Sequence, residues 1–428
     1  MLKPTVLALA CAAGMLASAA SVAQEPVRIS AELESQVIEW RRDFHQHPEL
    51  SNREFRTAKI VAEHLRELGI EVQTEVAHTG VVGILTGGKP GPTVALRADM
   101  DALPVTERAD VPFKSEVTTE YRGEEVGVMH ACGHDMHVAM LMGAAEKLAA
   151  MREDIAGTVM FIFQPAEEGA PKGEEGGAEL MLDEGLFTDL TPDAVFGIHV
   201  GSSAPTGYIG YRSGPLMASA DRFEINVKGV QTHGSRPWGG VDPIVAAAQI
   251  INNTQTVISR QTDITRGPAV VSFGIVDGGV RNNIIPDEVY LEGTIRNFDM
   301  ENRAQIFENL KTTAEHTAQS SGAEAHVHID EGYPVTVNDA ALTEQMLPTM
   351  KRVAGADKVV VSPLITGAED FSFYALEVPG LFVFLGVTPE GTDPATAPSN
   401  HSPYFYADED ALKIGTEMYV NWVFDYAK

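Results

Sequence analysis

Apolar residues recur along the chain at two spacings, and these separate predicted helices from predicted strands. A period near 3.6 predicts helices over residues 31–46, 51–68, 135–151, about 176–184, 242–260 and 300–320. Short runs rich in β-branched and aromatic residues predict strands over residues 70–76, 81–86, 93–98, 157–163, 194–199, 223–228, 269–276, 288–296, 325–329 and 381–387. Strands that alternate with helices are typical of an α/β fold with a largely buried sheet.

Two of the predicted helices begin at capping signals. Ser51 and Glu54 have the spacing of a capping box, and Gly69 suits the end of that helix. Asp135 stands where an N-cap of the next long helix is expected. We therefore expect these side chains to bond the first turns of their own helices.

The hydrophobic pattern changes near Gly214. The strand around Phe223 alternates apolar with charged residues, which indicates a sheet with one face in water. From there the order strand, helix, strand, strand, helix, strand suits a ferredoxin-like α+β domain. A chain of this length also favours more than one domain, and we expect boundaries at residues 24–213, 214–330 and 331–428.

The first 23 residues look like a secretory signal peptide. Lys3 precedes an apolar run that is too short for a membrane span, and Ser-Val-Ala at positions 21–23 fits the cleavage rule. We expect cleavage before Gln24 and a periplasmic or secreted protein. A lipoprotein signal is the alternative, which would require acylation of Cys11 inside the apolar run.

The charge of the remaining chain limits its partners. Without residues 1–23 it has 30 basic and 60 acidic residues, a net charge of −30, which disfavours nucleic acid. No remaining segment is apolar for long enough to span a bilayer. Cys132 is the one cysteine left, so no intramolecular disulfide is expected. Metal binding would protect this thiol in an oxidising compartment.

Several short motifs carry side chains suited to metal binding. Cys132 and His134 lie two residues apart just before a predicted helix. Glu167 and Glu168 follow a strand end, where one acid can bind metal while the other reaches a water. His199 ends another buried strand, and a further histidine lies on a proline-rich loop near the C-terminus. Each motif alone has an ordinary alternative, such as a buried cysteine or a solvated loop residue.

Together these motifs resemble the aminoacylase and carboxypeptidase-G type metallopeptidases. Within them they resemble the amidohydrolase branch, which holds hippurate hydrolases, indole-acetyl-amino-acid hydrolases and N-acyl-amino-acid amidohydrolases. The resemblance runs from Phe-His-Gln-His-Pro-Glu-Leu-Ser at 44–51 to Gly-Ala-Glu-Asp-Phe-Ser at 367–372. It implies an α/β, metal-binding catalytic domain with a mixed, mostly parallel sheet flanked by helices. It also implies an inserted, ferredoxin-like α+β domain that serves as lid and dimerisation domain.

The resemblance also implies two divalent metal ions per subunit. Mixed sulfur, nitrogen and carboxylate ligands favour zinc, with manganese, cobalt or nickel as alternatives. The implied ligands are Cys132, His134, Glu168, His199 and His401. Glu167 is implied as the general base. Where many of the wider group have a His-x-Asp ligand motif, this chain has Asp99 and Asp101, for which we expect a role in orienting ligands.

Further residues are implied to contact a small-molecule substrate. His233 and Asn283 would polarise the scissile carbonyl, Arg296 would grip the carboxylate of the amino acid, and Gly367 would line its binding site. The implied reaction is hydrolysis of the amide of an N-acyl or N-aroyl amino acid by a metal-activated water, giving a carboxylic acid and an amino acid. A carboxypeptidase or dipeptidase is the alternative. His233 could reach the metals by lid closure or from a second subunit, and the resemblance favours a homodimer through the inserted domain.

Two other classes of protein are alternatives to a metal-dependent hydrolase. A cysteine hydrolase would use Cys132 as nucleophile, with His134 or His137 as its base, and would leave the other implied ligands without a role. A metal-dependent binding protein without catalysis would lack a base or a ligand, whereas Glu167 and the full ligand set are present.

Overall fold

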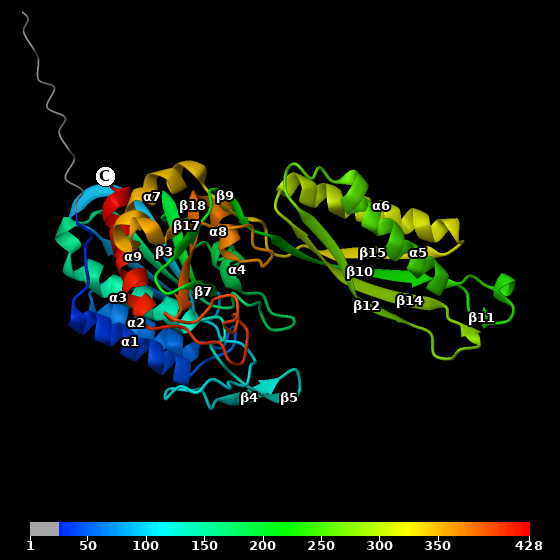
Figure 1. The fold of residues 1–428 in the computed structure, drawn as a ribbon, viewed down its shortest axis with the longest axis horizontal. Coiled ribbons are helices and arrows are strands. Elements are labelled where there is room, and N and C mark those ends of the chain that lie inside the picture. Colours follow the sequence, from blue (N-terminus) through cyan, green and yellow to red (C-terminus); the bar gives the residue numbers. More distant parts are fainter. Residues whose placement is uncertain (1–24) are drawn as a thin grey trace, which may run out of the picture.

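A computed structural model describes residues 25–428, so the expected signal peptide lies outside the described residues. The described chain forms two lobes, a larger lobe that contains residue 25 and the C-terminus and a smaller lobe, residues 219–330 (Figure 1). No helix within residues 25–428 has an apolar run that could cross a membrane.

The larger lobe is built on an eight-stranded sheet of order β1-β2-β6-β3-β7-β18-β8-β17. Its strands are β1 (Glu71–Val76), β2 (Gly80–Thr86), β3 (Lys89–Asp99), β6 (Ala156–Gln164), β7 (Ala194–Pro205), β8 (Ile209–Tyr211), β17 (Val359–Val361) and β18 (Gly380–Thr388). Pairs β6/β3, β3/β7, β7/β18 and β8/β17 are parallel, and the other three are antiparallel. The expected mixed, mostly parallel sheet is confirmed.

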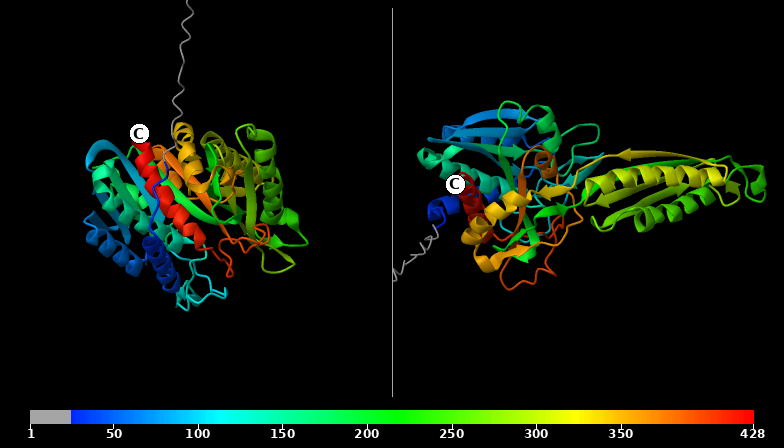
Figure 2. Two further views of the ribbon diagram at one scale, coloured as in Figure 1. Left: turned by 60° about the vertical axis from the view of Figure 1, so that its left-hand side comes forward. Right: turned by 90° about the horizontal axis from the view of Figure 1, so that it is seen from above.

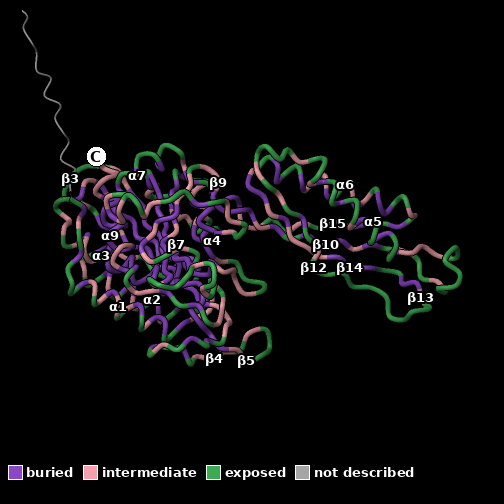
Figure 3. The backbone as a smooth tube through the Cα atoms, in the orientation of Figure 1, coloured by how far each residue is buried: buried purple, intermediate pink, exposed green. Residues whose placement is uncertain are grey.

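Helices cover both faces of this sheet (Figure 2). Alternation along β6 sends Phe161 into one apolar core and Met160 and Ile162 into another on the opposite face. The first core is closed by α1 (Ala31–Gln46), α2 (Phe55–Glu67), α3 (His134–Ala150), α7 (Ala340–Ala354) and α9 (Asp410–Tyr426). The second is closed by α4 (Gly177–Asp183) and α8 (Phe371–Glu377). Figure 3 shows this burial concentrated around the sheet.

The capping box predicted for α2 is wrong. The helix begins at Phe55 without a side-chain cap. Ser51 Oγ instead donates to Asp101 Oδ2 at 2.8 Å, and Glu54 Oε2 accepts from Thr79 Oγ at 2.6 Å. Both side chains are drawn to partners outside the helix, because buried carboxylates must be hydrogen-bonded.

The smaller lobe is a four-stranded antiparallel sheet of order β12-β14-β10-β15. Along the chain it consists of β10 (Ser219–Lys228), α5 (Pro243–Thr256), β12 (Ala269–Gly278), β14 (Glu288–Asn297), α6 (Met300–Ser320) and β15 (Glu324–Asp330). The helices pack on one face over Phe223, Ile225 and Leu291, which confirms the ferredoxin-like α+β arrangement. Helix α5 ends before the predicted residue 260, because the chain continues as a π-helical turn, Val257–Gln261.

Three short strand pairs complete the fold. β9 (Gly214–Met217) and β16 (Thr336–Asn338) pair where the two connections between the lobes enter the larger lobe. β4 (Thr118–Tyr121) and β5 (Glu124–Gly127) form a hairpin on the larger lobe. β11 (Thr232–His233) and β13 (Ile284–Ile285) pair at the end of the smaller lobe that lies farthest from the larger one (Figure 1).

Candidate metal centre

The start of α3 presents two of the predicted ligands. Gly133 is its N-cap at φ 93°, a left-handed conformation that glycine adopts without strain. A Cβ at this position would lie 2.3 Å from Cγ2 of Val200, so a larger residue does not fit. On either side of this turn, Cys132 and His134 place ligand atoms within 4.8 Å of each other.

Asp135 is not the N-cap that we predicted. Its carboxylate lies 2.9 Å from Nε of Arg41 and 2.9 Å from Nδ1 of His45, both on α1. Burial acts to raise the pKa of Asp135, but the two cationic partners outweigh it and hold the pKa well below its usual range. The residue therefore ties the first turn of α3 to α1.

The five predicted metal ligands come together at one edge of the sheet. The Sγ atom of Cys132 lies 3.3 Å from Nε2 of His199 and 3.2 Å from Nε2 of His401. The same atom of His401 lies 3.0 Å from Oε1 of Glu168. Potential ligand atoms lie within 4.8 Å of one another in three overlapping groups: Cys132–His134–His199, Cys132–Glu168–His401 and His134–Glu167–Glu168.

Main-chain carbonyl groups fix the two buried imidazoles. His134 Nδ1 donates to the carbonyl of Asp101 at 2.8 Å, and His199 Nδ1 donates to that of Val200 at 2.7 Å. Each ring therefore turns its Nε2 toward the cluster. His134 Nε2 is buried without a hydrogen-bond partner in the described chain, as expected of an atom that binds a metal.

Two carboxylates hold the loop that carries Glu167 and Glu168. Asp101 Oδ1 accepts from the N–H of Glu167 at 3.1 Å, and its Oδ2 accepts from that of Glu168 at 3.0 Å. Glu54 Oε1 accepts from the N–H of Ala166, a residue with φ 54°, at 3.0 Å. Left-handed backbone at a non-glycine residue is strained and needs such support. This geometry supports the expected role of Asp101 in orienting the ligands.

Asp99 orients its neighbours in the same way. Its Oδ1 accepts from Nδ1 of His137 at 2.5 Å, and its Oδ2 accepts from Arg97 at 2.7 Å. The second ring nitrogen of His137 accepts the N–H of Val200 at 2.8 Å. Both ring nitrogens of His137 thus form hydrogen bonds. This histidine therefore cannot bind a metal or act as the base of a cysteine nucleophile.

Carboxyl groups outnumber cations beside the ligands. Five are buried there: Asp99, Asp101, Glu167, Glu369 and Asp370. Arg97 pairs with Asp99, Glu369 and Asp370 at 2.7, 2.9 and 2.8 Å. Burial, Glu369 and Glu168 raise the pKa of Glu167 well above its ordinary value. Divalent cations would relieve this concentration of negative charge.

The surrounding charges favour the protonated forms of His134 and Cys132. Burial acts to lower the pKa of His134, but Asp99 and Asp101 outweigh it and raise the pKa to about 10. Burial and the carboxylate of Glu168 raise the pKa of the Cys132 thiol. A nucleophilic cysteine needs a lowered pKa, so the charges around this thiol disfavour the cysteine-hydrolase alternative. They suit a ligand that releases its proton when it binds a metal.

The predicted lid residues lie away from this cluster. His233 and Asn283 are exposed at the far end of the smaller lobe, where the carbonyl of Asn283 accepts the N–H of Gly234 at 2.8 Å. Arg296 is half-buried on β14, close to the larger lobe. Gly367 lies between the lobes, where its carbonyl accepts the N–H of Ala218 at 3.0 Å.

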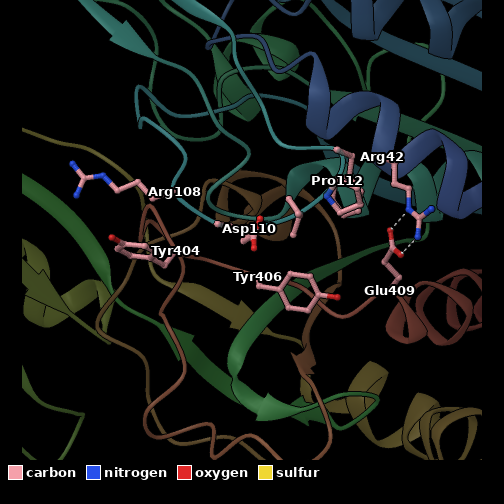
Figure 4. A pocket seen from close by; sticks show the side chains of 10 residues that line it. Arg42, Arg108, Asp110, Pro112, Tyr404, Tyr406 and Glu409 are labelled. Carbon is pink, nitrogen blue, oxygen red and sulfur yellow. Dashed lines mark hydrogen bonds and ion pairs between the residues drawn. The ribbon is translucent and has the colours of Figure 1, made fainter.

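A hollow of about 670 Å³ lies between residues 108–113 and the segment that carries Tyr404 and Tyr406 (Figure 4). Tyr404 and Tyr406 line one side, and Arg42 closes the other through two hydrogen bonds to Glu409 at 2.8 and 2.6 Å. None of the predicted metal ligands lines this hollow, so it is separate from the metal centre.

Sequence reasoning missed several residues that shape the site. Arg97 and Asp370 lie far apart in the chain, and no local pattern announces their ion pair. Glu369 lies in a motif that carries the resemblance, and this was the available signal. Glu54 and Tyr333 act through the main chain of the Glu167 loop, which no residue spacing reveals.

Comparisons with known proteins agree with this geometry. Residues 95–425 match the peptidase family M20/M25/M40. The chain is 43% identical over 386 residues to thermostable carboxypeptidase 2 of Saccharolobus solfataricus, covering 90% of this chain and 93% of that protein. It is 39% identical over 386 residues to N-acetylcysteine deacetylase of Bacillus subtilis, covering 90% and 95%.

A solved structure of the Bacillus subtilis YXEP protein, a dinuclear metal binding peptidase from the M20 family, has the same fold. The TM-score is 0.77 at 35% identity, over 93% of this chain and 100% of that chain. The resemblance seen in the motifs is thereby confirmed. The chain belongs to the peptidase family M20/M25/M40 and is a metal-dependent hydrolase of its amidohydrolase branch.

Proposed function

We propose that the protein hydrolyses the amide bond of N-acyl or N-aroyl amino acids, releasing a carboxylic acid and an amino acid. The observation that carries this proposal is the convergence of Cys132, His199, His401 and Glu168 beside Glu167. This set combines metal ligands with Glu167, a carboxylate that makes no ion pair with Arg97, so a general base would be available next to bound cations.

The chain's own residues would share the work as follows. Bound divalent cations would lower the pKa of a water and polarise the substrate carbonyl. Glu167 accepts a proton from the attacking water and passes it to the nitrogen of the leaving amine. Asp101 keeps the backbone of Glu167 in place through the N–H bond described above. Arg296 binds the substrate carboxylate near Gly367, and His233 with Asn283 donates to the developing oxyanion.

We propose two ions per subunit because Cys132 belongs to two of the ligand groups, one with His134 and His199 and one with Glu168 and His401. Zinc is the ion that this donor set fits best, since thiolate and imidazole are its usual ligands. Manganese, cobalt and nickel are alternatives that the same donors accept.

A metallo-carboxypeptidase or dipeptidase is the second candidate. The chemistry at the scissile amide is the same. Similarity to the carboxypeptidase from Saccharolobus solfataricus is the observation that favours this second candidate. The acyl half of the substrate would decide between the two, because a dipeptide carries a charged α-amino group where an acyl or aroyl group is apolar.

We also propose a homodimer formed through the inserted domain, residues 214–330. β12 is an edge strand of the smaller lobe, and its Val270, Ile275 and Val276 are 42%, 46% and 61% exposed. An exposed apolar edge strand is a template for pairing with a second chain. Such a dimer would let His233 of one subunit reach the metal centre of the other, which the far end of its own lobe does not (Figure 1).

For the cell, we propose a periplasmic or secreted protein whose signal peptide, residues 1–23, is removed before Gln24. The supporting features are the short apolar run and the cleavage pattern in the sequence. The mature chain would then comprise the catalytic domain in two parts, residues 24–213 and 331–428, on either side of the inserted domain.

A substrate panel tests the proposal. The metal-loaded protein is assayed with hippurate, N-acetyl, long-acyl and indole-acetyl amino acids beside dipeptides, each with a chelator-treated control. The proposal predicts chelator-sensitive release of amino acid from one or more N-acyl compounds, with a higher kcat/KM than for any dipeptide. Turnover of dipeptides alone would favour the second candidate, and turnover that survives chelation would overturn both.

A further inference from the structure

The main chain of Glu167 is held from two sides. Its N–H donates to Asp101, which ends β3 of the larger lobe. Its carbonyl accepts from the hydroxyl of Tyr333 at 2.7 Å. Tyr333 lies in neither lobe proper but in residues 331–335, which lead from β15 of the smaller lobe back to β16. A segment between the lobes therefore contacts the loop of the proposed general base.

The same segment is bonded to the smaller lobe on its other side. The carbonyl of Tyr333 accepts the N–H of Ala220, on β10, at 2.9 Å. Gly332 donates its N–H to Asp221 Oδ1 at 3.1 Å, and its carbonyl accepts from Arg303 at 3.2 Å. Asp221 and Arg303 form a buried ion pair at 2.5 Å, which joins β10 to α6.

These contacts form a continuous path between the two lobes. It runs from α6 through Arg303 and Asp221 to Gly332, and from the adjoining Tyr333 to Glu167. The described chain passes between the lobes at two places, between β9 and β10 and through residues 331–335, so a turn of the smaller lobe must move this segment (Figure 1). The hydroxyl of Tyr333 would then shift or release the carbonyl that it binds.

We propose that Tyr333 is a positioning residue that couples the orientation of the smaller lobe to the backbone of Glu167. The carboxylate of Glu167 takes its productive position when the smaller lobe holds residues 331–335 as seen here. This inference rests on the proposed function, because it assigns Glu167 as the general base. It adds a link between lid and base that does not pass through the substrate.

The first test is Tyr333→Phe in the metal-loaded enzyme. The ring that contacts Phe373, with centroids 6.1 Å apart, is retained, and only the hydroxyl is lost. Loss of one such hydrogen bond predicts a fall in kcat of about 2- to 10-fold, with KM and metal content unchanged. Tyr290→Phe is the matched control, since its hydroxyl donates to Glu292 on the smaller lobe alone. It should leave kcat unchanged.

The second test asks whether Tyr333 transmits the orientation of the lobe. Arg303→Lys weakens the ion pair with Asp221 and should lower kcat in the wild-type background but have little further effect in Tyr333→Phe. If Arg303→Lys does not fold, Asp221→Asn takes its place. Equal fold-losses in both backgrounds, or an unchanged kcat in Tyr333→Phe, would overturn the proposal.

Hydrogen exchange separates this inference from the proposed function. In metal-loaded protein without substrate, amides of residues 166–169 should exchange faster in Tyr333→Phe and in Arg303→Lys than in wild type or Tyr290→Phe. If no amide substrate is turned over, the proposed function fails while the exchange rates still decide the coupling. Unchanged exchange at residues 166–169 in Tyr333→Phe would sink the coupling, whatever the substrate.

Discussion

Replacing Asp101 by asparagine should loosen the metal centre without removing a ligand. The carboxylate accepts from the N–H groups of Glu167 and Glu168, at 3.1 and 3.0 Å, and from Ser51 Oγ at 2.8 Å. An amide of the same shape has one acceptor oxygen, and its NH₂ group would face the second N–H. At least one buried donor would then lose its partner, at a cost of roughly 1–3 kcal/mol.

That cost should appear in metal binding as well as in stability. Loss of an outer-shell partner of this kind typically weakens metal affinity by about 10- to 100-fold, which corresponds to about 1.4–2.8 kcal/mol. The cost of the lost hydrogen bond and the loss of metal-binding free energy are of similar size. This is expected, because a displaced Glu168 binds the metal more weakly. Metal affinity is measured by competition with a chelator, and stability by the thermal midpoint of the metal-free protein.

Two variants serve as controls for Asp101→Asn. Asp193→Asn makes the same chemical change at an exposed carboxylate that accepts the N–H of Thr93 at 2.8 Å, and it should leave metal affinity unchanged. Ser51→Ala removes only the third hydrogen bond of Asp101 and should weaken affinity less than Asp101→Asn does. Affinity of Asp101→Asn within twofold of wild type would refute the reasoning.

Three further predictions concern the base, the protons and the lid. Glu167→Gln should keep its metal, as measured by elemental analysis, but its kcat should fall by about 10²- to 10⁴-fold. Glu168→Gln should lose metal. Near-normal turnover of metal-loaded Glu167→Gln would show that Glu167 is not the general base. Metal affinity should rise with pH between 6 and 8, because the raised pKa values of Cys132 and His134 mean that both release protons on binding; a pH-independent affinity would contradict this. His233→Ala should lower kcat with metal content intact, and mixing it with Glu167→Gln should restore activity if the histidine acts across a dimer. Failure despite proven subunit exchange would indicate closure of the chain's own lid.

The spacing of hydrophobic residues predicted most helices and strands, because each of these elements buries its apolar side in a core. Helices 31–46 and 300–320 begin and end as predicted, since each has a polar cap and one apolar side. The predicted caps Ser51 and Asp135 failed for a shared reason. Both are buried polar residues whose partners lie in other elements, and these tertiary bonds outweigh a local cap.

The ligand set was predictable because metal binding demands particular side chains, and motifs keep them at fixed spacings. The residues that support the set were not, since they act by position and not by chemistry of their own. In the sequence, nothing distinguishes Tyr333 from other residues of a linker. Its role follows from the hydrogen bond that its hydroxyl donates to the carbonyl of Glu167. Arg97 reads as part of a strand, and only the structure shows three carboxylates around it.

In the metal centre that we propose, Cys132 binds the metal together with His134, Glu168, His199 and His401. The most direct test is metal-edge X-ray absorption of the zinc-loaded protein, with metal content measured in parallel on wild type and Cys132→Ser. We expect two ions per chain and a sulfur neighbour at about 2.3 Å from zinc. In Cys132→Ser that neighbour should vanish and metal content should fall. Zinc bound at full content without a sulfur neighbour in the wild type would show that Cys132 is not a ligand.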